Sequence, residues 1–390
     1  MKLKSLCLGF MTTFITSASF GQTGSLIVPP NTVLPRDTIV KKQLIASISD
    51  LLSQTTKPSK ENTLVQKSDL LETSALLDEM KDLGKSDKFK DDNFYKPYLT
   101  NATQLNDTTF IIQLSYIGVN ESSPFLRASF TLLAQKRGAQ FYFNSPLKQN
   151  TASWKLQKFG NTNVYYKNAF NSSNAKAFFK MIAEYDKKLN APNMPTDFYC
   201  ADNFHEVLQL LGIDYKSDYN GHAHNAETVK ENDYYLNVDG NLTSSFAKFD
   251  PHDLWHERLH NVLSTDIINR PVDEGTAYLY GGSWGISWKD ILEKFKTYAI
   301  ANPNADWLSL YNESRNFDEK GKFPLNVDFV INALVVQKIE KEKGFPSVIE
   351  LLSCGKKEKG NDNYFKALEK ITGISKTNFN TNVWTLIKTN

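Results

Sequence analysis

Cysteine is scarce in this chain of 390 residues, which contains only three. Cys7, Cys200 and Cys354 lie far apart, and their spacing fits none of the paired-cysteine zinc motifs. In an exported protein Cys200 and Cys354 would either form one disulfide or remain two buried thiols. The sequence leaves both alternatives open, but it contains no cysteine-based zinc site.

An excess of charge of either sign is also absent. The chain has 45 Lys and Arg residues and 43 Asp and Glu residues. Residues 1–21 contain two lysines and no acid, so their removal would leave 43 of each kind. A neutral protein gives no reason to expect nucleic acid or an anionic membrane as a partner.

Long hydrophobic runs are missing as well, since a membrane span needs about 18 or more apolar residues. The apolar stretch from Leu6 to Ile15 is too short, and it follows the basic residues Lys2 and Lys4. Small residues then precede Gln22. This order is typical of a secretory signal peptide cleaved near Gly21-Gln22. We therefore expect an exported protein, periplasmic or extracellular, without a membrane span.

The most informative residues present are His256-Glu257-Arg258-Leu259-His260. On a helix, His256 and His260 are four residues apart and share a face, so that one tetrahedral zinc ion can bind both imidazoles. Glu257 can then reach a metal-bound water and act as the general base. The alternative is a pair of ordinary helix histidines with a surface glutamate.

A third ligand is expected 14 residues after His260, at Glu274. Pro271 and two acids indicate that a second helix begins there. Two histidines and one carboxylate leave the fourth zinc position open for water, as in catalytic sites. Tyr278, four residues further on the same face, would orient a ligand, reach the oxyanion, or simply belong to the core.

Two neighbouring residues have open roles. His252 precedes His256 by four residues and would contact the edge of the metal site, bind substrate, or be a solvated side chain of the first turn. Asp273 is a candidate acceptor for the second ring nitrogen of a ligand histidine, which normally needs such a partner.

With His256, Glu257, His260 and the segment Glu274-Gly275-Thr276-Ala277-Tyr278, the sequence resembles the gluzincin (peptidase MA-like) zinc metallopeptidases. The resemblance extends over about residues 195–390, including the pattern of helices in the C-terminal tail. It implies a bound Zn²⁺ ion, a peptide or protein substrate, and hydrolysis of the peptide bond by metal-activated water.

Two features depart from that family. Arg258 stands at a position that is normally uncharged, and the gap from His260 to Glu274 is shorter than in most gluzincins. Because a guanidinium is costly to bury unpaired, we expect Arg258 to face solvent or to pair with Asp253 or Asp273. The alternative function is a catalytically degenerate exported binding or scaffold protein that keeps the peptidase fold.

The overall pattern predicts an α+β fold. Amphipathic helices are expected at 37–53, 69–83 and 174–189. The C-terminal half is expected to be mostly helical, with helices at about 272–280, 288–301, 325–341, 346–352, 361–371 and 378–388. Five short runs rich in aromatic and β-branched residues are expected to form one antiparallel meander, at 110–116, 125–134, 140–143, 154–159 and 164–167. The predicted regions are a signal peptide at 1–21, an N-terminal helical region at 22–90, an antiparallel-sheet domain at 91–192 and a gluzincin-like domain at 193–390.

Overall fold

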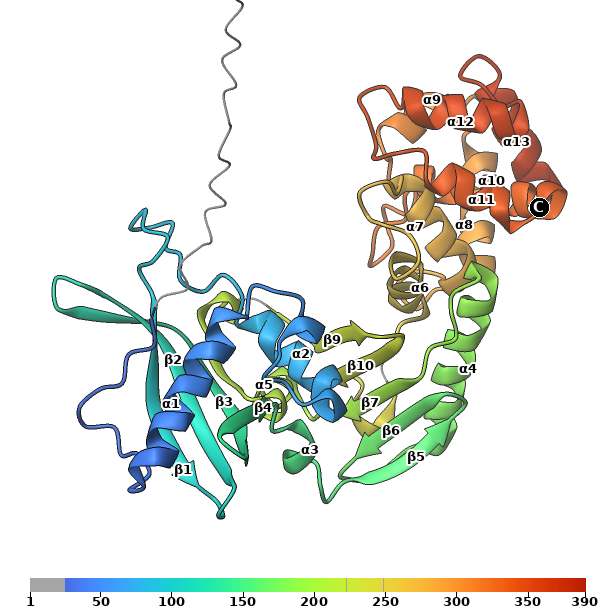
Figure 1. Cartoon of the computed structure of the whole chain (residues 1–390). Helices are drawn as coiled ribbons and strands as arrows, with labels where there is room; N and C mark the ends of the chain where they lie inside the picture. The colour runs from blue at the N-terminus through green and yellow to red at the C-terminus, as the bar shows by residue number, and fades with distance from the viewer. Residues whose placement is uncertain (1–24, 222, 248) are drawn as a thin grey trace, which may run out of the picture. The chain divides into compact units, whose positions relative to one another are not determined.

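The computed structural model describes residues 25–221, 223–247 and 249–390. The predicted signal peptide lies outside these residues. The fold is α+β, as expected, and the chain forms two compact units (Figure 1). Unit 1 comprises Met1–Asn150 and Leu208–His224, and unit 2 comprises Thr151–Val207 and Asn225–Asn390. The boundary predicted between residues 192 and 193 falls inside unit 2.

Unit 1 is an antiparallel sheet packed against two helices. The strands pair in the order β1-β2-β3-β4, and β8 adds to β3. Helix α1 lies against β4 and buries Leu44, Ile48 and Leu51, which recur at helical spacing on one face. The elements of unit 1 are α1 (Thr38–Ser53), α2 (Leu70–Glu79), β1 (Lys96–Gln104), β2 (Thr109–Asn120), β3 (Ser123–Arg137), β4 (Gln140–Asn144), α3 (Leu147–Asn150) and β8 (Ile213–Lys216).

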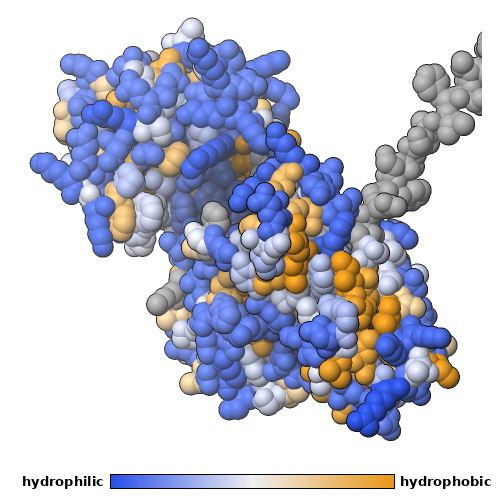
Figure 2. Space-filling model, turned by 90° about the vertical axis from the view of Figure 1, so that its left-hand side faces the viewer, coloured by the Kyte–Doolittle hydropathy of each residue, from blue (hydrophilic) through white to orange (hydrophobic). Residues whose placement is uncertain are grey.

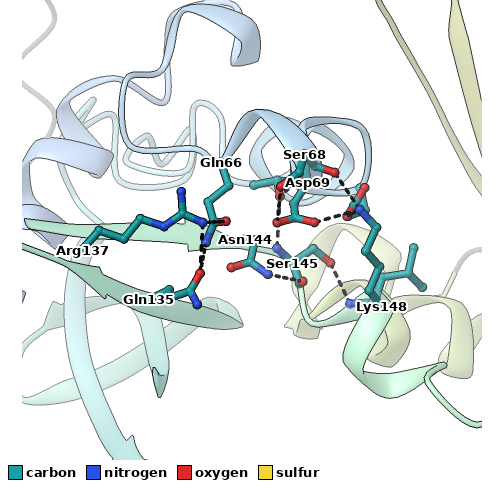
Figure 3. Close-up of polar contacts among 11 residues, drawn as sticks. Gln66, Ser68, Asp69, Gln135, Arg137, Asn144, Ser145 and Lys148 are labelled. Atoms are coloured by element: carbon teal, nitrogen blue, oxygen red, sulfur yellow. Dashed lines mark hydrogen bonds and ion pairs between the residues drawn. The ribbon is translucent and has the colours of Figure 1, made fainter. Parts of the chain in front are cut away.

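A group of polar side chains connects the start of α2 to α3 (Figure 3). Lys148 Nζ lies 2.8 Å from Asp69 Oδ1 and 2.5 Å from Glu72 Oε1. Glu72 is buried, and this burial raises its pKa above the ordinary value despite the hydrogen bond from Lys148. We call Asp69, Glu72 and Lys148 the Lys148 cluster. In this cluster the ammonium group of Lys148 is the cation that pairs with the buried carboxylate of Glu72.

Unit 2 contains a mixed sheet in the order β5-β6-β7-β10-β9. Strands β6, β7 and β10 run parallel to one another, whereas β5 and β9 at the edges are antiparallel to their neighbours. Helix α4 forms the crossover between β6 and β7. The strands and first helix of unit 2 are β5 (Lys155–Phe159), β6 (Thr162–Tyr166), α4 (Ser172–Leu189), β7 (Thr196–Cys200), β9 (Ala226–Glu231) and β10 (Tyr234–Asp239). Helix α5 (Phe204–Leu211) begins in unit 2 and ends in unit 1.

The prediction of one antiparallel meander was wrong. The first three runs form β2, β3 and β4 in unit 1, but the last two form β5 and β6 in the sheet of unit 2. A run of strand-forming residues does not specify its partner. Here β6 pairs with β7, which returns only after the 18 residues of α4.

The rest of unit 2 is helical, and the helices predicted from periodicity in the tail are confirmed to within about three residues. The short helix α9 was missed. Helix α10 lies at the centre, with Val330, Ile331 and Leu334 fully buried, and packs against α7. These helices are α6 (Pro251–His260), α7 (Arg270–Gly281), α8 (Trp288–Ala301), α9 (Trp307–Asn312), α10 (Val327–Lys343), α11 (Phe345–Leu352), α12 (Asp362–Thr372) and α13 (Phe379–Thr389).

The surface drawn in Figure 2 is mainly hydrophilic, with a band of hydrophobic side chains. Among the described helices, none has the length and apolar composition that a membrane span requires. Both Cys200 and Cys354 are free thiols, so the first of the two alternatives, a disulfide between them, is not formed.

Candidate metal centre

Helix α6 places three histidines on one face. Asp250 caps the helix by accepting a hydrogen bond from the backbone N–H of His252 at 2.9 Å, and Pro251 occupies the first turn. Leu254, Trp255 and Leu259 are buried on the opposite side, where they anchor the helix in the core. His252, His256 and His260 therefore share the remaining face at four-residue spacing.

Helix α7 packs beside α6 and supplies the carboxylates (Figure 1). The two helices approach closely because Gly281 has no side chain. A Cβ atom at Gly281 would lie only 2.6 Å from the backbone of His252. Gly275 allows a similarly close approach to Asn332 of α10. The spacing between α6 and α7 thus depends on glycine, and Asp273 and Glu274 project from α7 toward the histidines.

Three atoms from His252, His256 and Glu274 converge. The Nε2 atoms of the two histidines lie 3.2 Å apart, and Glu274 Oε2 lies 3.5 Å from that of His252 and 3.8 Å from that of His256. A point about 2.0 Å from all three atoms exists within this triangle, which matches the distances of zinc to nitrogen and oxygen ligands. The three residues fit a zinc ion.

The other ring nitrogen of each histidine has an acceptor. His252 Nδ1 lies 2.7 Å from the carbonyl oxygen of Gly282, and His256 Nδ1 lies 2.8 Å from Asp273 Oδ1. In the neutral imidazoles these contacts place the proton on Nδ1 and leave the Nε2 lone pair free, which is the usual arrangement of metal-binding histidines. Asp273, a candidate acceptor from the sequence, thus lies in hydrogen-bonding contact with His256.

A second grouping, His256, His260 and Asp273, is less suited to a metal. Asp273 Oδ1 lies 2.8 Å from His256 Nδ1, and its Oδ2 lies 2.9 Å from His260 Nε2. Both distances are those of hydrogen bonds, and each carboxylate oxygen already has one histidine partner. Asp273 thus bridges two imidazoles. We call His252, His256, His260, Asp273 and Glu274 the histidine cluster.

The charges of the histidine cluster are strongly coupled. Burial raises the pKa of Glu274, but hydrogen bonds and charge from His252 and His256 outweigh it and lower this pKa to about 2. Burial lowers the pKa of His256, but Asp273 and Glu274 outweigh it and raise this pKa to about 9. A metal ion binding through His256 Nε2 must therefore displace a proton at neutral pH.

The predicted ligands are only partly brought together. The structure places His256 and Glu274 in contact, with His252 as the third residue, whereas the predicted ligand His260 lies beside Asp273. Two signals in the sequence point to this set. His252 and His256 have the same four-residue spacing as His256 and His260, and Glu274 follows on the second helix.

Glu257, the predicted general base, lines a different cavity from the histidines. That cavity lies on the side of α6 facing α4, where Glu257 has Asp186 and Arg258 as neighbours. Desolvation by the surrounding protein raises the pKa of Glu257, although half of its side chain remains exposed. Arg258 forms a bidentate ion pair with Asp186, at 2.7 and 3.0 Å. Arg258 thus pairs with an acid, which was one of the two expected alternatives, but its partner is Asp186 of α4 rather than Asp253 or Asp273.

Tyr278 packs against the cluster from the core. Its side chain is almost fully buried, and its ring centroid lies 5.9 Å from that of His252. Burial raises its pKa to about 12, despite hydrogen bonds to Ser283 and the backbone of Asn326. Tyr278 is therefore a core tyrosine whose ring lies beside the imidazole of His252.

A recess of about 290 Å³ opens beside the cluster, lined by His256, His260, Asp273, Glu274 and Arg270 among others. Arg270 extends from the start of α7, with its guanidinium largely exposed and 3.7 Å from Glu274 Oε1. The sequence matches no known family model and no curated protein.

Proposed function

We propose that the protein is an exported zinc metallopeptidase-like hydrolase whose metal ligands are His252, His256 and Glu274. The observation that carries this proposal is the convergence of His252 Nε2, His256 Nε2 and Glu274 Oε2 on one point. Export is supported by the N-terminal sequence, and peptide hydrolysis by the resemblance to gluzincins.

Shifting the ligand pair by one helical turn improves that resemblance. The motif then reads His252-Asp253-Leu254-Trp255-His256, which leaves the charged Arg258 outside it. The gap from the second histidine to Glu274 becomes four residues longer, so the short spacing disappears. The shifted motif no longer has these two departures from the family, but it has one of its own. Asp253 stands where the family motif has glutamate.

Zinc bound at such a site supplies a Lewis acid and a water whose pKa falls to about 7. Each side chain then has a distinct role. Asp253, exposed and next in sequence to His252, is the candidate proton acceptor. Asp273 and Gly282 orient the two imidazoles through their Nδ1 atoms. Arg270, at the mouth of the recess, is available to a substrate carboxylate or carbonyl.

A second candidate function is metal binding without catalysis, in a binding or scaffold protein. Two observations favour it. Glu257 lies in another cavity, and the carboxylate of Asp253 is one methylene shorter than that of the glutamate it replaces. A shorter side chain has less reach toward a proton that must be transferred over hydrogen-bonding distance.

The zinc content of purified protein tests the ligand set, with two matched histidine variants of the same helix. We expect about one zinc per chain in the wild type and in His260→Ala, and its loss in His252→Ala. Loss in His260→Ala with retention in His252→Ala would show that the ligand pair is His256 and His260. Absence of zinc from the wild type, even after addition of the metal, would contradict both functions.

Peptidase activity distinguishes the two candidates once zinc is present. With a library of fluorogenic peptides, we expect Asp253→Asn to lower kcat by about 10²–10⁴-fold, as expected for loss of a general base. Glu257→Gln should retain activity, because Glu257 faces the other cavity. A zinc-loaded protein that cleaves no peptide of the library would favour the scaffold function.

A further inference from the structure

A cavity of unit 2 lies on the opposite side of α6 from the histidine cluster. Its volume is about 600 Å³, which is within the range of small-molecule sites. One wall is a face of the sheet, to which β10 contributes Tyr235 and Asn237 at two-residue spacing. A second wall is a face of α4, and α6 closes one end with Glu257 and Arg258. We call it the α4 cavity.

At the end of the α4 cavity near α6, the side chains offer more hydrogen-bond acceptors than the protein has donors for. Asp186 occupies two N–H groups of Arg258, at Nε and Nη2. Glu257 is only loosely paired, with Oε1 at 3.6 Å from Arg258 Nη1, and its side chain is 51% exposed. Asn237 Oδ1 is buried and has no hydrogen-bond partner within the described structure. A buried acceptor without a donor is unfavourable, and such groups mark places where a ligand or water binds.

The other end of the cavity is aromatic. Phe159 and Phe179 stack there with their ring centroids 5.1 Å apart. Phe198, 5.8 Å from Phe179, lies beside Asn237 on the sheet wall between the two ends. Phe179 and Asp186 are seven residues apart on α4, which corresponds to about 10 Å along the helix. The cavity therefore has an aromatic end and an acceptor-rich end separated by the length of a small molecule.

We propose that the α4 cavity binds a small molecule with a primary ammonium group at one end and an apolar, ring-containing body. The ammonium would donate hydrogen bonds to Glu257 and Asn237, and the body would lie along Phe159 and Phe179. A carboxylate at the same position would face Glu257 and Asp186 and would be repelled. Lys176, Lys180 and Lys187 also border the cavity, but all three are exposed and their charge is screened by solvent.

Three probes of equal length test the chemistry of this site: 4-phenylbutylamine, 4-phenylbutanol and 4-phenylbutyrate. Isothermal titration calorimetry with the whole protein should show the amine binding with a Kd of about 1 mM or tighter, given its size. The alcohol should bind about tenfold more weakly, because it lacks the charge-assisted hydrogen bonds, and the acid more weakly still. Equal binding of acid and amine, or no binding of any probe, would overturn the proposal.

Matched variants locate the site. Glu257→Gln keeps the size of the side chain and leaves the Asp186–Arg258 pair in place, and it should weaken the amine about tenfold while sparing the alcohol. Lys180→Gln, which removes a charge at the rim, should change neither by more than about twofold. His252→Ala should also leave binding intact, which separates this site from the metal centre. An amine affinity that is unchanged in Glu257→Gln would contradict the proposal, provided that circular dichroism shows native folding.

Discussion

The Lys148 cluster of unit 1 and the histidine cluster of unit 2 differ in what stands opposite their buried carboxylates. Each places carboxylates in a partly or fully buried position. In unit 1 the ammonium of Lys148 lies between Asp69 and Glu72, so that the cation belongs to the chain itself. In unit 2 the three converging atoms are all potential acceptors, and without a proton or an added cation between them they repel one another. The first arrangement is complete, whereas the second has the geometry to accept a cation from outside.

The largest effect expected from this difference is that zinc stabilises unit 2 but not unit 1. At a free zinc concentration about 1,000 times the Kd, binding should add about 4 kcal/mol to the free energy of unfolding of unit 2. Cys200 and Cys354 both lie in unit 2, so the rate of their alkylation in denaturant, read by peptide mass, reports its unfolding. The protection should vanish in His252→Ala. Protection that persists in this variant would contradict the proposed ligand set.

A smaller change in the free energy of unfolding is expected when the ammonium group of Lys148 is removed from unit 1. Lys148→Ala leaves the buried carboxylate of Glu72 without its partner and should cost about 1–3 kcal/mol in the free energy of unfolding. The expected cost is below that of a fully buried pair because the Lys148 side chain is 52% exposed. Denaturant unfolding of unit 1 measures it. Lys85→Ala, which removes an exposed pair with Asp87, is the control and should leave the unfolding midpoint unchanged.

The smallest effect concerns the pH dependence of unit 1. The pKa of Glu72 is raised above its ordinary value of 4.5 in the folded protein, so the folded state binds its proton more tightly than the unfolded state does. The contribution of Glu72 to stability therefore declines as pH rises from about 4.5 through its folded pKa. Glu72→Gln should flatten this decline in unfolding curves recorded between pH 4 and 7. A wild-type protein that becomes relatively more stable over this range would reverse the assigned direction.

Much of unit 2 could be predicted from sequence because its helices carry their signals locally. Asp250 and Pro251 mark the start of α6, and the helix predicted at 288–301 is α8 with the same bounds. The partners of the strands could not be predicted, since pairing depends on residues far apart in the chain. Strand β6 thus joined a different sheet from β4, although only α3 and β5 separate them.

The candidate metal centre was predicted only in part for a related reason. The sequence locates three histidines and two acids on two helices, but four-residue spacing on α6 is shared by two overlapping pairs. The choice between these pairs depends on how α7 is placed against α6. The structure places Glu274 beside His252 and His256, and Asp273 between His256 and His260. No local pattern contains that information.

The contact between Gly281 and the backbone of His252 limits which mutations this protein can accumulate. A methyl group at position 281 would force α6 and α7 apart, and it would do so next to the carbonyl of Gly282 that orients His252. Descendants of this sequence could exchange many surface side chains of α6 and still keep the histidine geometry. They could not exchange Gly281, even for alanine, without relocating a ligand. Position 281, which takes no part in any chemistry, should therefore vary as little as the histidines themselves.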